Sequence, residues 1–525
     1  MSERAASGLL RSGVVVSGMT FLSRVAGLVR DLVIAVSFGA GPLTDAFFVA
    51  FRIPNLLRRL FGEGAVSHAV VPVLSETDAR GDEAATRDLI AHVIGTLGGV
   101  LIAVSALGAV LAPVLVWVFA PGFVGDGERY DPAVAMLRIC FPYVFFISLV
   151  AAAGAVLQSR GRFAVPAATP ILLNLCMIGS AIWLAPMLEQ PVHALAIGVL
   201  LAGVVQLGFQ LPALARLGLL VRPSWGWRHP GTRKVMALLM PFVLSSGVYQ
   251  FNALVSSVVA SMMVAGSVSW LYYADRLLEF PHALIGVALG TVILPQLARV
   301  HQRSDTDTFE RTVQWALFVG LLLGLPAALG LAGLADAVIA TLFQYGAFDD
   351  TDRDMAALAL RVLALALPAL IVIKVLTPAF SSRQDTRTPV RIAVGCMALN
   401  MIGCVLFGLG LLRAGHAAPH IGLSAATALS TLLQAGLLAF CLRDTVSWRP
   451  SRAGARAAAQ LAVACAVMVL VMWALSPEPA WWGEVAMRQR VLTLGGIIAA
   501  STAAYVTALA CMGLRPSALR TVGGP

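Results

Sequence analysis

Charged side chains lie inside stretches of the chain that are otherwise apolar enough to cross a membrane. Nine cations occupy such stretches: Arg24, Arg30, Arg52, Arg58, Arg59, Arg138, Arg276, Arg361 and Lys374. Five acids accompany them: Asp31, Asp45, Glu63, Asp275 and Glu279. A charge at the bilayer centre costs about 2.5–3.5 kcal/mol on insertion scales, so these residues indicate either a functional site or tight ion pairing.

Helical spacing places these charges on distinct faces. Arg24 and Asp31 are seven residues apart and share a face, whereas Arg30 points roughly 120° away from it at about 100° per residue. Two further sets follow the same logic: Asp45, Arg52, Arg59 and Glu63 form one stripe with Arg58 beside it, and Asp275, Arg276 and Glu279 occupy little more than one turn. Lipid cannot face such stripes, so we expect them to line a hydrated space enclosed by protein.

The surplus of cations over acids predicts an anionic partner. The guanidinium group of arginine is planar and stays charged, and it can bind a phosphate through two hydrogen bonds at once. Clustered arginines in a wide cavity therefore favour a phosphate or pyrophosphate head group. The alternative interpretation is a set of structural ion pairs, with other arginines extending to the membrane surfaces.

Composition identifies the elements that must position these charges. Of the 525 residues, 59% are hydrophobic and 12% are charged, and the mean hydropathy is +0.85. These values exclude a soluble globular protein with a single anchor. Since a span needs about 20 apolar residues, the chain predicts an all-α membrane protein of about fourteen helices: 12–38, 44–75, 89–119, 133–158, 163–185, 192–215, 235–262, 268–298, 311–336, 353–380, 389–412, 420–441, 457–475 and 489–513.

The distribution of basic residues predicts the orientation. With the N-terminus inside, most lysines and arginines of the connections fall on the inner side, so we expect both termini in the cytoplasm. The net charge of +10 is thereby explained by topology, and nucleic acid is not an expected partner. The seven cysteines lie in apolar stretches without CxxC spacing, so neither disulfides nor a metal site is predicted.

The chain also repeats itself at a constant offset. A shift of 223 residues superimposes Pro72 on Pro295, Leu137-Arg138 on Leu360-Arg361 and Pro166 on Pro389. Because six helices separate the copies, both halves have the same orientation in the membrane, which predicts two six-helix lobes. We expect an N-terminal lobe at 1–220, a C-terminal lobe at 221–445, and two additional helices at 446–525.

The charged helices also carry recognisable motifs. The segments MTFLSRVAGLVRD (19–31), TDAFFVAFRIPNLLRRLFGEGAVSHAVVPVLSE (44–76), WLYYADRLLEFPHALIGVALGTVILPQLA (270–298) and SSRQDTRTPVRIA (381–393) closely resemble the bacterial lipid II flippase family MurJ, also called MviN. This family belongs to the multidrug/oligosaccharidyl-lipid/polysaccharide exporter superfamily. Its two six-helix lobes agree with the repeat, and its additional helix pair corresponds to 446–525, where the family forms a lipophilic groove.

The resemblance implies a transporter, not an enzyme, that moves undecaprenyl-pyrophosphate-linked peptidoglycan precursor to the outer leaflet of the bacterial inner membrane by alternating access. No catalytic residue, cofactor or metal is expected, and the coupling ion is unknown. Lipid II, membrane lipid and the cell-wall synthesis machinery are the expected partners. The expected substrate-binding residues are Arg24, Arg30, Arg58, Arg59 and Arg276; Asp31, Asp45, Arg52, Glu63, Asp275 and Glu279 are expected to act in gating or structure.

Other functions remain as alternatives. A flippase for another polyprenyl-pyrophosphate glycan has the same composition, and a cation-drug antiporter of the same superfamily should have an acidic or aromatic cavity. A membrane glycosyltransferase or phosphatase would need a cluster of metal-binding acids or a nucleophile, which the short loops lack. Some family members bind sodium through carboxylates on helices 7 and 11; here 235–262 has no acid, and Asn400 and Cys404 occupy the other helix. Sodium coupling by that route is not expected.

Overall fold

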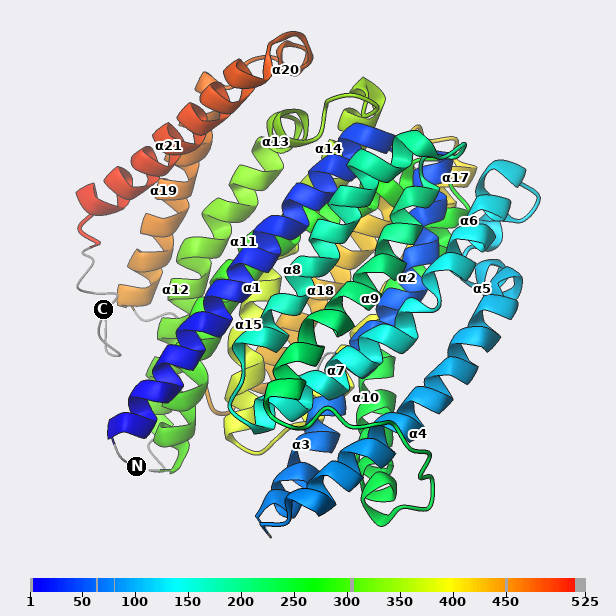
Figure 1. Cartoon of the computed structure of the whole chain (residues 1–525). Helices are drawn as coiled ribbons and strands as arrows, with labels where there is room; N and C mark the ends of the chain where they lie inside the picture. Colours follow the sequence, from blue (N-terminus) through cyan, green and yellow to red (C-terminus); the bar gives the residue numbers. More distant parts are fainter. Residues whose placement is uncertain (1–2, 63–64, 80, 303–305, 449–451, 515–525) are drawn as a thin grey trace. The chain divides into compact units, whose positions relative to one another are not determined.

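The computed structural model describes residues 3–62, 65–79, 81–302, 306–448 and 452–514 (Figure 1). Within these ranges every regular element is helical, and the chain divides into two compact units, Met1–Val268 and Ser269–Pro525. The prediction of an all-helical protein is therefore confirmed.

The described residues of unit 1 form ten α-helices. They are α1 (Glu3–Phe38), α2 (Pro42–Gly62), α3 (Ala65–Asp78), α4 (Glu83–Val110), α5 (Ala112–Phe119), α6 (Gly127–Cys140), α7 (Tyr143–Ser159), α8 (Ala164–Gly179), α9 (His193–Arg216) and α10 (Pro230–Ser261). Short η1 (Pro121–Phe123), η2 (Ser180–Leu184) and η3 (Ala185–Met187) connect them. Helix α1 packs on α8, α2 packs on α6, and α9 packs on both α7 and α8.

Small residues allow the close approach of these helices. A Cβ at Gly198 of α9 would lie 2.8 Å from the Ser180 Oγ, and one at Gly203 would lie 2.8 Å from the Cβ of Phe146. Because apolar lipid gives helices little hydrophobic reason to associate, such close van der Waals contact is a main source of packing energy in a membrane.

Unit 2 begins two residues into α11 (Ser267–Gln302). It continues with α12 (Thr306–Gly333), α13 (Ala335–Leu342), α14 (Asp350–Ala364), α15 (Leu367–Ser382), α16 (Arg387–Gly403), η4 (Cys404–Gly408), α17 (Leu409–Arg413), α18 (Ile421–Cys441), α19 (Arg452–Leu475), α20 (Trp481–Glu484) and α21 (Met487–Cys511). Helices α19 and α21 pair with each other and pack on α12 and α13.

Two polar contacts attach α21 to the rest of unit 2. The Tyr505 hydroxyl donates to the Leu322 carbonyl at 2.7 Å. The buried guanidinium of Arg490 donates to the carbonyls of Ala340 and Gln344 at 3.0 and 2.9 Å. Arg490 therefore holds the start of α21 against α13 and the segment that follows it.

The elements of the two units recur with the offset that the sequence repeat predicts. Helix α4 and α12 begin at 83 and 306, α5 and α13 at 112 and 335, and α6 and α14 at 127 and 350, a difference of 223 in each case. Both α8 and α16 end in a five-residue π-helix, η2 and η4. The repeat thus extends from residue identities to helix breaks, although one helix departs from the expected lobes: α10 packs on α2, α3 and α4 within unit 1.

Ten segments of the described residues are helices long and apolar enough to cross a membrane. They coincide with predicted spans. The other four predicted spans fall on helix as well, at α1, at α2 with α3, at α10 and at α11. The chain is a multi-pass membrane protein, and the total of fourteen spans stays a prediction.

Candidate functional site

Arg30 lies at the interface between α1 and α8 and is only 7% exposed. Its Nε and Nη2 donate to Asp31 Oδ1 at 2.9 and 2.6 Å, and its Nη1 donates to Asn174 Oδ1 at 3.2 Å. Asn174 in turn donates from Nδ2 to the Ser23 carbonyl at 3.1 Å. Asp31 is fully buried, so Arg30 neutralises it and ties α1 to α8.

Helical spacing groups Asp31 with Arg24, and the structure adds the direct neighbour Arg30 as a partner of Asp31. Arg30 reaches its direct neighbour Asp31 because its side chain is long and flexible. Helical spacing gives the direction in which a side chain leaves the helix and not where a flexible guanidinium ends. Arg24 itself is partly buried on α1.

Asp45 has a structural partner that the sequence analysis missed. Its side chain is 0% exposed, and its Oδ2 accepts the backbone N–H of Gly266 at 2.7 Å. Gly266 lies in the connection between α10 and α11 with φ +96°, a conformation that a residue with a Cβ rarely adopts. Asp45 therefore holds this connection against the first turn of α2.

The remaining charges of α2 become more exposed along the helix. Arg52 and Arg58 are partly buried and Arg59 is exposed. The Nε of Arg58 donates to Asn55 Oδ1 at 2.9 Å, one turn earlier. Glu63 lies outside the described residues. The stripe thus begins with a buried carboxylate and ends in accessible guanidinium groups.

In unit 2 the charged turn of α11 is open. Arg276 is partly buried and donates from Nη1 to Glu279 Oε2 at 2.9 Å; the side chains are 28% and 51% exposed. Asp275 is exposed. An exposed pair of this kind contributes little to stability, typically about 0–1 kcal/mol.

The charge inventory needs one correction. Arg361 of α14 forms an ion pair with Asp336 of α13, an acid at the end of a predicted span that the count of five left out. The surplus of cations is smaller than the sequence analysis stated. Some arginines of α1, α2 and α11 nevertheless remain accessible to solvent in the described residues, and they lie in the motifs at 19–31, 44–76 and 270–298. These are Arg24, Arg52, Arg58, Arg59 and Arg276.

The chain resembles known proteins over most of its length. The family model described as "Lipid II flippase MurJ" matches residues 34–489. The "Probable lipid II flippase MurJ" of Vibrio cholerae is 43% identical over 517 residues, which is 97% of this chain and 97% of the relative. The "Lipid II flippase MurJ" of Burkholderia cenocepacia is 39% identical over 512 residues and covers 97% of this chain and 98% of the relative.

Solved structures share the fold. A structure titled "Lipid II flippase MurJ, inward closed conformation" superimposes with a TM-score of 0.76 at 23% identity, over 95% of this chain and 100% of that chain. An inward-facing multidrug resistance MATE family transporter of the MOP superfamily superimposes with a TM-score of 0.61 at 14% identity, over 82% of this chain and 97% of that one. At these identities the likeness concerns the fold alone.

Proposed function

The chain belongs to the MurJ family of lipid II flippases, and from this membership we propose how its arginines bind the substrate. A member of this family is a transporter that moves lipid II across the inner membrane for peptidoglycan synthesis, and it is not an enzyme. The comparisons favour neither a flippase for another glycan nor a drug antiporter.

In this proposal Arg24, Arg58, Arg59 and Arg276 bind the pyrophosphate of lipid II. The observation that carries it is the difference in burial among the arginines. Arg276 is paired with an exposed carboxylate and Arg59 is exposed, whereas Arg30 is buried on Asp31. We assign Arg30 the role of fixing α1 on α8, so that Arg24, about two turns earlier, is presented at a defined position.

The acids take supporting roles. Asp45 joins α2 to the α10–α11 connection through Gly266, so a change at this connection would be transmitted to the helix that carries Arg52, Arg58 and Arg59. Glu279 is the counter-ion that Arg276 releases when the pyrophosphate arrives. We also propose Asp275 and Glu63 as gating charges, because Asp275 is next to Arg276 and Glu63 follows Arg59 by four residues in the sequence.

Transport would proceed by alternating access of two lobes, with both termini in the cytoplasm. The proposed lobes are 1–220 and 221–445, and the polyprenyl tail would remain in lipid or against the helix pair of 446–525. The regular recurrence of helices at an offset of 223 residues supports a construction from two equivalent halves. The excess of basic residues on one side supports the orientation.

Coupling to sodium through a carboxylate pair has no support in this sequence. Helix α10, which corresponds to the seventh predicted span, contains no acid from Pro230 to Ser261. Asn400 is 2% exposed and its Oδ1 contacts the Cys404 thiol at 3.9 Å. The membrane potential or another ion is therefore the proposed energy source.

Depletion of the protein followed by lipid analysis tests the transport function. Depletion of a flippase leaves lipid II synthesised but confined to the inner leaflet, whereas loss of a biosynthetic enzyme leaves lipid II unmade.

Complementation with Arg24→Ala and Arg276→Ala tests the binding residues, with exposed Arg488→Ala as the matched control. Each lost charge-assisted hydrogen bond is worth about 1.5–3 kcal/mol, so binding should weaken at least about tenfold, and lysine should rescue poorly. A folded and fully active double variant would end this assignment.

A further inference from the structure

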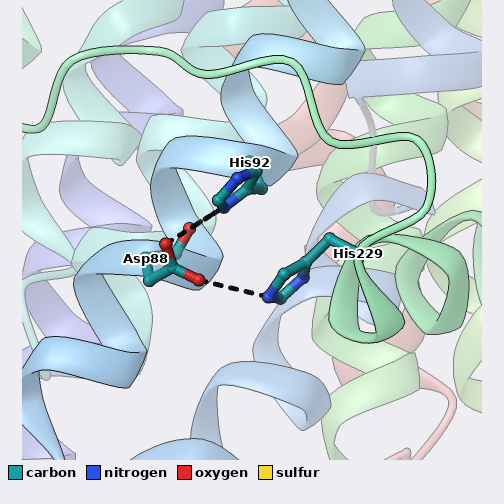
Figure 2. Close-up of side chains that lie close together, drawn as sticks. All are labelled: Asp88, His92 and His229. Atoms are coloured by element: carbon teal, nitrogen blue, oxygen red, sulfur yellow. Dashed lines mark hydrogen bonds and ion pairs between the residues drawn. The ribbon is translucent and has the colours of Figure 1, made fainter.

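Three side chains with metal-ligating atoms converge in unit 1. Asp88 and His92 are four residues apart on α4, and His229 precedes α10 (Figure 2). The three offer one donor atom each, and these atoms lie within 4.8 Å of one another. The sequence alone does not predict this cluster, because the third side chain comes from a distant part of the chain.

The segment that carries His229 is fixed to α4 along its length. Arg87 Nε donates to the Gly218 carbonyl at 2.7 Å, and the Ser224 N–H donates to the Ala91 carbonyl at 3.0 Å. The Gly226 N–H donates to the Thr96 Oγ1 at 2.9 Å. These bonds join successive residues of the segment, at 218, 224 and 226, to α4. They hold the segment, and with it the His229 imidazole, close to Asp88 and His92.

Glycines make this close docking possible. A Cβ at Gly95 of α4 would lie 2.2 Å from the Ser224 carbonyl oxygen, and a Cβ at Gly226 would lie 2.3 Å from the Cδ2 of His92. The backbone of the segment therefore rests directly on α4 and presses against the His92 ring. The site is preorganised by main-chain contacts on both sides.

Hydrogen bonds determine which nitrogen of each ring can bind a cation. His92 Nδ1 lies 2.9 Å from the Asp88 carbonyl oxygen and 3.3 Å from Asp88 Oδ1, so it is the His92 nitrogen that faces the carboxylate, and it gives up its bond to the carbonyl when a cation binds. His229 Nε2 lies 3.2 Å from Asp88 Oδ2, and its Nδ1 accepts a long bond of 3.4 Å from the Thr232 N–H.

From this arrangement we infer that Asp88, His92 and His229 form a binding site for a borderline transition-metal cation, with zinc as the reference ion. Two imidazoles and one carboxylate suit Zn²⁺, whereas Mg²⁺ and Ca²⁺ prefer sets of oxygen ligands. The site leaves positions for water, since Asp88 is 55% exposed and each histidine 25%.

Binding requires a small and definable rearrangement. Zinc bonds of about 2.1 Å to tetrahedral ligands place the donor atoms about 3.4 Å apart, so donors now within 4.8 Å must draw together. The two rings, stacked with centroids 4.8 Å apart and 2° between planes, must tilt so that both lone pairs meet one ion. The proton of His92 moves from Nδ1 to Nε2, and the proton of His229 moves from Nε2 to Nδ1, which gives up the long contact with Thr232.

Titration of the full-length protein with zinc chloride tests the inference. The protein is purified in detergent with an affinity tag that contains no histidines, stripped with a chelator, and titrated by calorimetry; Co²⁺ is used in parallel because its visible absorption reports its ligands. We expect one saturable site per chain, a thermal unfolding temperature that rises with zinc, and a dissociation constant raised by more than about tenfold in His92→Gln and His229→Gln.

Three further variants make the result decisive. His416→Gln removes an exposed histidine of unit 2 and should leave binding unchanged. His92→Cys supplies another zinc ligand and should retain binding, and Asp88→Asn should weaken it with little change of shape. Unfolding temperatures measured without metal show which variants are folded. If wild-type protein shows no saturable zinc binding, or if the glutamine variants bind as wild type does, the three side chains are only a hydrogen-bonded contact between α4 and α10, and the inference is wrong.

Discussion

Arg30→Ala should destabilise the protein, whereas Arg24→Ala should impair transport in a protein that remains folded. The two arginines lie on the same helix; Arg30 is buried, with bonds to the Asp31 carboxylate, whereas Arg24 is only partly buried. Replacing Arg30 removes two bonds to Asp31 and one to Asn174. It leaves the fully buried Asp31 without the guanidinium that neutralises it.

The magnitude follows from that burial. Removing one partner of a buried ion pair costs about 3–5 kcal/mol, because the other charge stays in a low-dielectric environment. Asn174→Ala loses a charge-assisted bond to Arg30 and a neutral one to Ser23, for a total of about 2–4 kcal/mol. Arg24 is partly exposed, so its loss should cost less than about 1 kcal/mol.

Thermal unfolding in detergent and growth complementation should be measured on the same variants. Arg30→Ala should unfold several degrees below wild type and accumulate poorly. Adding Asp31→Asn should recover much of the loss, because the buried charge is gone; the double-mutant cycle should give a coupling of about 0.5–3 kcal/mol. The reasoning is refuted if Arg30→Ala unfolds like wild type and yet does not complement, since Arg30 would then act on the substrate.

The other predictions concern topology, coupling and the attachment of α21. In a background without the exposed native cysteines, a cysteine at Asp350 should react with an impermeant thiol reagent from outside and one at Arg228 should not; the opposite labelling would invert the orientation. Complementation should survive replacement of sodium by potassium and fail when the membrane potential is collapsed, whereas strict sodium dependence would contradict the proposed coupling. Arg490→Ala should lower the unfolding temperature because four carbonyls lose a buried donor, and exposed Arg488→Ala should not; equal effects would mean that Arg490 does not hold α21.

The sequence was sufficient for properties that depend on the local chain. Apolar length predicts a span because every backbone polar group in lipid must bond within its own helix, and each predicted span falls on helix. The repeat was visible as matched prolines and arginines such as Pro72 with Pro295, and the helix ends recur with the same offset. The motifs around Arg24, Asp45 and Arg276 identified the family, which the comparisons then showed.

Only the tertiary structure decided the partner of each charge. Helical periodicity states which side chains of one helix share a face, but not how that helix is rotated against its neighbours or how far a flexible side chain bends. Asp31 is therefore found on Arg30, and Asp45 on the backbone of Gly266. His229 meets Asp88 for the same reason: the contact is made by packing a connecting segment onto α4, which no spacing along the chain encodes.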